Sequence, residues 1–367
     1  MSLQLQLHAE HCRYCGTRDD LTPCLRCKHV HFCKHHRGSK DHKVECSRLF
    51  NGYQQFIAFE AMQPLNHQGV KEWSIPFAAL PEASKSSYMA HCLNYATNLL
   101  QIDQVQRQEL ALALLSRVCS QPDGPERPRK IGRLAARMPC LLLRLGKDQE
   151  CYHFCKWWNT PSTNWRSKQV AELWNEPPAD RLESVDFMLV QCSRGYLAEL
   201  EALRLAGCDI AYYACIILVK IRILVKLDKF GAVDTLMPKY ATPQEIADMI
   251  KNEILDDDSI PNRHRLWPRE AYTTHIANLN LQIRQLVEGV SRCLPHFWPE
   301  LLRMADSRDP ITLQQEKSQN GTWGISGGSR ALKHTFRVWQ ETPGAIEMVR
   351  KIVSAQRCEL KAVAGDS

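Results

Sequence analysis

Apolar side chains recur at every third or fourth position along most of the chain beyond residue 48. This spacing places them on one face of an α-helix, so it predicts a succession of amphipathic helices. Runs with a period of two are scarce, and we therefore expect few strands. The stripes that carry this prediction are Tyr88, Cys92, Tyr95, Leu99 and Ile102; Tyr196, Leu200 and Leu203; Tyr272, Ile276, Leu279, Ile283, Leu286 and Val290; and Ile346, Val349 and Val353.

Polar segments rich in turn-forming residues separate these stripes, at 121–130, 159–167, 177–181, 256–262 and 320–329. They divide the chain into helical pairs of unequal length, which predicts an irregular, solenoid-like domain of helical hairpins. A 34-residue repeat is not evident. An earlier helix is expected from an N-cap at Ser39 to Pro64, shared between the N-terminal segment and the body. We expect three regions: 1–48, 49–357 and a tail over 358–367.

Composition places the chain among packed globular proteins. It has 367 residues, of which 44% are hydrophobic and 24% charged. Residues Met1–Glu10 lack the basic start and apolar run of a signal peptide. The most apolar stretch, 210–227, contains Lys220, Arg222 and Lys226, which a membrane span would not tolerate. We therefore expect no contact with a membrane and a cytoplasmic or nuclear location, or both.

Cysteine and histidine concentrate near the N-terminus. Six of the 16 Cys lie between residues 12 and 46, and seven of the 14 His lie between residues 8 and 42. Two CxxC pairs precede a further Cys, two His and a Cys, and Zn²⁺ prefers four sulfur or nitrogen ligands in structural sites. The spacing therefore predicts two structural zinc ions on eight ligands, which are Cys12, Cys15, Cys24, Cys27, Cys33, His36, His42 and Cys46.

This pattern resembles the MYND-type zinc finger, in which two CxxC pairs and an aromatic-Cys step, here Phe32-Cys33, precede a helix with His-x3-Cys, here His42 to Cys46. The resemblance implies a cross-brace, with Cys12, Cys15, Cys33 and His36 on one ion and Cys24, Cys27, His42 and Cys46 on the other. The spacing alone equally allows sequential pairing.

One position departs from the family pattern. Arg37 stands where the family usually has a ligand Cys, so a neighbouring His must replace it. His36, three residues after Cys33, shares its face in a helical turn and is preferred, while His35 stays the alternative. Segments 144–152, 156–158 and 341–345 are similar to segments of fungal MYND-finger proteins of uncharacterised function, a resemblance that implies no activity.

Three other patterns favour ordinary structure over chemistry. Cys151 and Cys155 share a helix face opposite His153, which indicates a buried Cys pair with an exposed His. Glycines over 321–328 predict a flexible loop, because a strand and a Lys-Ser/Thr ending are missing. The densest basic cluster is typical of a solvated face, and we consider nucleic-acid contact unlikely; it comprises Arg127, Arg129, Lys130, Arg133 and Arg137.

These patterns together predict a mainly α protein, with a small two-zinc, cross-braced, MYND-like finger ahead of a helical domain. Recognisable catalytic motifs are missing from the sequence, so we expect an adaptor or regulatory protein without enzymatic activity, which binds other proteins. We identify no small-molecule substrate. Two alternatives stay open: a DNA-binding transcriptional regulator, and a protein lysine methyltransferase similar to the SET-and-MYND enzymes.

Overall fold

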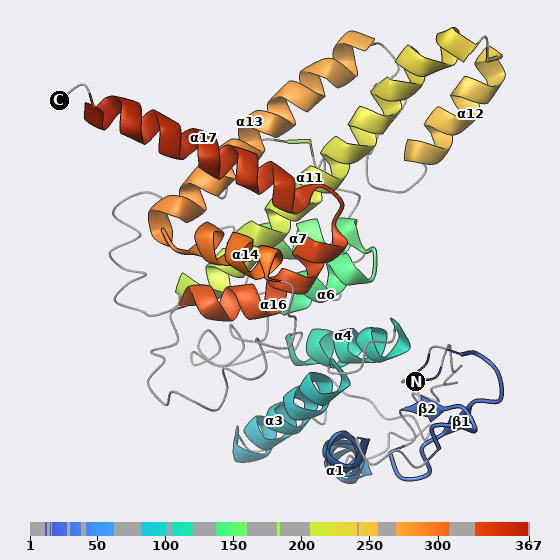
Figure 1. Ribbon diagram of the computed structural model, residues 1–367. Helices are drawn as coiled ribbons and strands as arrows, with labels where there is room; N and C mark the ends of the chain where they lie inside the picture. Colours follow the sequence, from blue (N-terminus) through green and yellow to red (C-terminus); the bar gives the residue numbers. More distant parts are fainter. Residues whose placement is uncertain are drawn as a thin grey trace. The chain divides into compact units, whose positions relative to one another are not determined.

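Figure 1 shows the computed structural model of the chain. The structure describes residues 12, 15, 17–27, 30–37, 42–61, 82–100, 105–119, 137–159, 182–183, 206–240, 242–255, 269–307 and 327–365. The chain divides into two compact units. The first comprises Met1–Leu134 with Gln169–Ala171, and the second comprises Ala135–Lys168 with Glu172–Ser367.

The first unit joins a small hairpin to three helices. Strands β1 (Thr22–Pro23) and β2 (His31–Phe32) pair antiparallel, with Thr22 opposite Phe32 and Pro23 opposite His31. The helices are α1 (His42–Ala61), α3 (Glu82–Leu99) and α4 (Val105–Cys119), and α3 packs against both α1 and α4. The hairpin and the three helices belong to one compact unit.

Aromatic side chains join α1 to α3. Tyr95 is buried in α3, and the rings of Phe56 and Tyr53 in α1 lie with their centroids 5.6 and 5.9 Å from its ring. Gly52 of α1 leaves room for Asn98 of α3, because a Cβ atom at this position would lie only 3.1 Å from Nδ2 of Asn98. The Asn98 amide also donates a hydrogen bond to the carbonyl oxygen of Arg48. The middle of α1 and the helix α3 are thus fixed to one another.

The second unit is built around the long helix α11 (Ala206–Leu236). Its residues from Ile210 to Ile221 are buried on every side, which is typical of a helix enclosed by others. It packs against α6, α7, η2, α12, α13 and α16. The surrounding elements are α6 (Met138–Arg144), α7 (Asp148–Asn159), η2 (Met237–Tyr240), α12 (Gln244–Leu255), α13 (Arg269–Cys293), α14 (Phe297–Asp306), α16 (Gly327–Glu341) and α17 (Ala345–Gly365).

The predicted mainly α fold, with a small Cys- and His-rich region ahead of a helical body, is confirmed. Within the described ranges, strands are confined to β1 and β2. The stripe over 88–99 is buried along α3, and that over 272–290 runs along α13. The expected N-cap at Ser39 and the stripe over 196–203 lie outside the described residues. No helix in the described segments is long and apolar enough to cross a membrane.

Both of the expected boundaries, after residues 48 and 357, fall inside helices of the structure. Helix α1 runs unbroken through residues 48 and 49, and α17 continues to Gly365, beyond the expected start of the tail. The compact units divide near residue 134. Contact between elements and separate folding are different properties, so the division after residues 48 and 357 stays a prediction.

Candidate metal centre

The eight ligands expected from the sequence lie in two groups of four. In each group the ligand atoms lie within 4.8 Å of one another. The first cluster is Cys12, Cys15, Cys33 and His36, and the second cluster is Cys24, Cys27, His42 and Cys46. The two groups alternate along the chain in pairs, which is the arrangement of a cross-brace and differs from sequential pairing.

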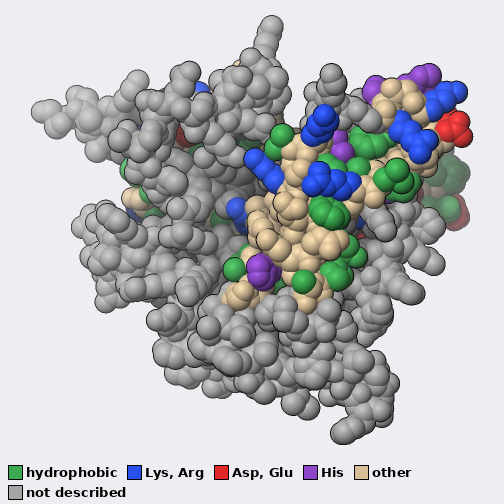
Figure 2. Space-filling model, turned by 90° about the horizontal axis from the view of Figure 1, so that it is seen from below, with side chains coloured by type: hydrophobic (Ala, Val, Ile, Leu, Met, Phe, Trp, Pro, Cys, Tyr) green, Lys and Arg blue, Asp and Glu red, His purple; other side chains and the backbone are tan. Residues whose placement is uncertain are grey.

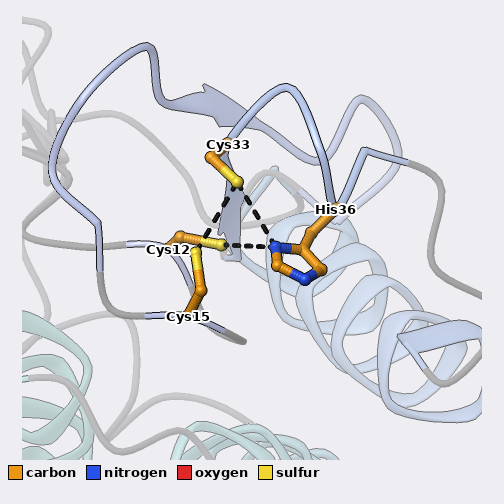
Figure 3. Close-up of side chains that lie close together, drawn as sticks. All are labelled: Cys12, Cys15, Cys33 and His36. Carbon is orange, nitrogen blue, oxygen red and sulfur yellow. Dashed lines mark hydrogen bonds between the residues drawn. The ribbon is translucent and has the colours of Figure 1, made fainter.

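The first cluster is held by two turns. The Cys12 N–H donates to the carbonyl oxygen of Thr17, which folds back the segment that carries Cys12 and Cys15. After β2, the His36 N–H donates to the carbonyl oxygen of Cys33 at 3.1 Å, so the two side chains share one side of the turn. Figure 3 shows the four side chains pointing toward one another. Nδ1 of His36 lies 3.3 Å from Sγ of Cys33 and 3.7 Å from Sγ of Cys12.

The second cluster joins a turn between the strands to the start of α1. The Cys24 N–H donates to the carbonyl oxygen of Val30 at 2.7 Å and closes the turn that carries both cysteines. His42 and Cys46 lie one helical turn apart on α1, so their side chains share a face. Nε2 of His42 lies 3.3 Å from Sγ of Cys27, and Sγ of Cys46 lies 3.6 Å from Sγ of Cys24.

These distances fit a tetrahedral metal ion. With Zn–S bonds of about 2.3 Å, two thiolates on one tetrahedral ion lie roughly 3.7 Å apart. Sγ of Cys15 lies 3.7 Å from Sγ of Cys33, close to the 3.6 Å between Cys24 and Cys46. A disulfide needs about 2.05 Å, so both pairs have the spacing of ligands on an ion. Three sulfurs and one imidazole nitrogen form the donor set of a structural zinc site.

Local hydrogen bonds favour the metal-binding thiolate form of one cysteine in each cluster, Cys24 and Cys33. Burial acts to raise the pKa of the Cys24 thiol, but hydrogen bonds from the backbone N–H groups of Cys27 and Arg26 oppose it. Together with Cys46 and His42 they lower the pKa of Cys24 to about 7. Burial likewise opposes ionisation of Cys33, and the bond with His36 helps to lower the pKa of that thiol. The thiolate is the metal ligand, so the surroundings of these two cysteines suit metal binding, whereas the pKa of Cys15 and that of Cys46 are raised.

A carboxylate supports the histidine of the second cluster. Nδ1 of His42 lies 3.1 Å from Oε2 of Glu45, while Nε2 faces the cysteines. A histidine ligand commonly donates its other N–H to a carboxylate, which fixes the ring and its tautomer. The ring of Phe32 meets that of His42 edge to face, with centroids 5.2 Å apart. The sequence prediction did not include Glu45, although its position three residues after His42 is the spacing of helical neighbours.

The other patterns singled out in the sequence lie elsewhere. Cys151 and Cys155 are buried in α7 as expected, but the expectation of an exposed His153 is wrong. Its side chain is 7% exposed and lies 2.7 Å from the Gln149 amide nitrogen, because α7 is enclosed on more than one side. Residues 321–326 of the glycine-rich segment lie outside the described residues, and 327–328 begin α16.

The basic cluster over 127–137 is described only at its end. Arg137 forms the N-cap of α6, and burial lowers the pKa of its guanidinium. Its side chain is therefore only partly exposed. Residues 127–136 lie outside the described part of the chain.

Comparisons of the chain with models of protein families, with curated proteins and with solved structures find no match. The two Cys/His clusters are therefore established by the geometry of this chain alone. They are consistent with a zinc finger that could bind two metal ions.

Proposed function

We propose that this chain is a zinc-binding adaptor or regulatory protein that acts by binding other proteins and has no catalytic activity of its own. In this proposal the finger is of the MYND type, each cluster holds one structural zinc ion, and His36 is the histidine ligand of the first cluster. The main support for this proposal is the alternation of the two ligand groups along the chain. It supports a compact, cross-braced module, whose metal ions serve the fold and leave its outer surface for binding.

An exposed surface beside the second cluster supports a role in binding. Leu25 is 85% exposed in the turn between Cys24 and Cys27, and Val44 is 64% exposed in the first turn of α1. Arg26 joins these two segments: its Nη1 donates to Oγ of Ser47, and its guanidinium lies 5.2 Å from the centre of the Phe50 ring. We name Leu25, Arg26, Val44 and Ser47 the finger surface.

The chemistry of the finger surface favours a protein partner. Two exposed aliphatic side chains belong to the same two segments as an arginine whose guanidinium is held by Ser47 and Phe50. Figure 2 shows a face of the molecule on which hydrophobic side chains lie beside those of Lys and Arg. Apolar contact with a polar rim is the usual composition of protein interfaces. We therefore propose a partner segment with an apolar anchor and acidic neighbours.

The test is co-purification of the tagged full-length chain from its native source, with quantitative mass spectrometry. We compare the wild type with Leu25→Asp and Val44→Asp, which change exposed side chains and leave the ligands in place. Leu281→Asp is the matched control, because Leu281 is 55% exposed on α13 of the second unit. The wild type and the control should enrich the same proteins, and the two finger variants should lose them while retaining two zinc ions per chain.

Two results would contradict this proposal. The finger surface would not be the binding site if Leu25→Asp and Val44→Asp enriched the same proteins as the wild type. A protein set that disappeared on nuclease treatment would indicate that nucleic acid bridges the interaction, and would favour the DNA-binding alternative.

A further inference from the structure

Exposed apolar side chains gather in one short segment of the second unit. Among the described residues, nine large hydrophobic side chains are exposed, and four of them lie within 236–249. These are Leu236 at the end of α11, Tyr240 in η2, and Ile246 and Met249 in α12. Single exposed hydrophobic residues are ordinary on a protein surface, whereas a group of them is typical of an interaction site.

One side of α12 is fixed to α11. Ala247 and Lys251, one helical turn apart, are buried, and among the described elements α12 packs chiefly against α11. The Lys251 ammonium pairs with the carboxylate of Asp234 and lies 5.2 Å from the centre of the Phe230 ring. Figure 1 shows α12 folded back along the C-terminal part of α11. The other side of α12 is therefore presented by a helix whose position is fixed from behind.

The outer side of α12 has a stripe of its own. Ile246 and Met249 are 46% and 70% exposed, Ile250 is partly exposed, and Glu253 is exposed. These residues stand at positions i, i+3, i+4 and i+7, so they share one face of the helix. Apolar anchors at this spacing are the ones that pack against a second helix. We name Glu245, Ile246, Met249, Ile250 and Glu253 the α12 surface.

The charges of the α12 surface are negative. Glu245 and Glu253 are exposed, and Asp248 beside them is partly exposed. Lys251, the cation of this helix, is buried on the side that faces α11, and the exposed Lys239 precedes the helix in η2. An apolar stripe with carboxylates is complementary to an apolar stripe with Lys and Arg, and it disfavours an acidic partner.

We propose that the α12 surface binds a basic amphipathic helix of a partner protein, with aliphatic side chains at helical spacing beside Lys and Arg. This inference goes beyond the finger surface, because it concerns the other compact unit and does not depend on zinc. The finger surface contains Arg26 and suits acidic neighbours, whereas the α12 surface contains carboxylates. The two surfaces therefore select partners of opposite charge.

The experiment measures fluorescence anisotropy of a labelled synthetic helix of Leu and Lys, titrated with the full-length protein. Leu occupies positions i, i+3, i+4 and i+7. A scrambled peptide of the same composition lacks the stripe, and a second control peptide has Glu in place of every Lys. The protein variants are Ile246→Asp, Met249→Asp and the double change Glu245→Lys with Glu253→Lys. Leu281→Asp is the matched control, because Leu281 is also an exposed aliphatic residue of the second unit.

The wild type should bind the basic helix at least about tenfold more tightly than either control peptide. Ile246→Asp and Met249→Asp should each weaken this binding about tenfold or more, because each places a carboxylate in the apolar part of the interface. The double charge reversal should exchange the preference, so that the Glu peptide binds more tightly than the Lys peptide. Leu281→Asp and the finger variant Leu25→Asp should bind as the wild type does.

Other outcomes would overturn the inference. Equal affinity for the three peptides would do so, and so would wild-type affinity in both Ile246→Asp and Met249→Asp. A dimer seen by light scattering in the wild type and lost in these variants would instead identify a second copy of this chain as the occupant. Far-UV circular dichroism verifies folding, and the charge reversal preserves the test if an Asp variant is unfolded. Leu25→Asp affects only the proposed finger surface, so failure there is distinguishable from failure here.

Discussion

Replacement of Arg222 by methionine should destabilise the second unit by about 3 kcal/mol. Arg222 lies on α11, and its Nη1 donates to the carbonyl oxygen of Leu143 at 2.9 Å and to Oδ1 of Asp148 at 2.6 Å. Its Nε donates to Oγ1 of Thr342. One guanidinium therefore joins the central helix to α6, to the start of α7 and to the segment after α16.

The magnitude follows from the burial of this network. Removal of one partner from a buried ion pair costs about 3–5 kcal/mol. The side chains of Arg222 and Asp148 are 19% and 12% exposed, so residual solvent access places the expected loss near the lower end. A unit of this size loses about 2–4 °C of melting temperature per kcal/mol, which gives a decrease of about 6–12 °C. Asp148→Asn retains an acceptor and should cost about 1–2 kcal/mol.

The assay is urea unfolding followed by tryptophan fluorescence. Eight of the nine Trp belong to the second unit, so the signal reports mainly on its unfolding. Arg303→Met is the control: it breaks an ion pair with Glu300 whose side chains are 60% and 40% exposed. Such pairs contribute at most about 1 kcal/mol. Equal losses for Arg222→Met and Arg303→Met would refute the argument that the three-way network stabilises the unit.

Three further predictions concern metal, thiols and charge. Metal analysis should give two zinc ions per full-length chain, one in Cys24→Ser and two in Cys358→Ser; one ion in the wild type would show that a cluster is incomplete. Alkylation of the native protein should modify the exposed Cys358 rapidly, and the buried Cys140, Cys151, Cys155 and Cys215 only after unfolding, as peptide mass spectrometry can verify. Replacing Arg127, Arg129, Lys130 and Arg133 by Gln should leave partner binding intact, and any DNA binding should disappear near 150 mM salt, with a log–log slope of about −0.9 per phosphate contact. A sequence-selective DNA complex that survives such salt and is lost in the Gln variant would favour the DNA-binding alternative.

The ligand groups were the most predictable part of the chain, because short-range spacing determines much of their geometry. A CxxC turn and a His-x3-Cys step on a helix each bring two ligands together within five residues. The combination of these pairs into two clusters depends on the hairpin, and the spacing alone left it open. Only the resemblance to MYND fingers indicated the alternation that the structure has. In the described turn His36, rather than His35, joins Cys33, in keeping with their separation of three residues.

Charged and polar side chains inside the helical parts were the least predictable. From the sequence, Lys220 and Arg222 indicated only that residues 210–227 do not span a membrane. In the structure, Lys220 is fully buried in α11. Its Nζ donates to the carbonyl oxygen of Glu183 and lies 5.4 Å from the centre of the Tyr152 ring. These partners are distant in the sequence, so periodicity could not reveal them. The burial of His153 was missed for the same reason, because a helical pattern does not show how many sides of a helix other elements cover.

Helix α1 shows why the finger and the adjacent helices are linked in stability. Its first turns supply the ligands His42 and Cys46, and its later turns place Phe56 against Tyr95 of α3. A small finger gains most of its folding energy from metal binding, so the zinc ion proposed for the second cluster would also order the start of this helix. Because α1 is continuous, order at its first turn favours the packing of α3, and that packing in turn holds the two ligands in place. The ligand pattern ends at residue 46 while the helix does not, so the spacing of cysteines delimits the metal sites but not the structure that stabilises them.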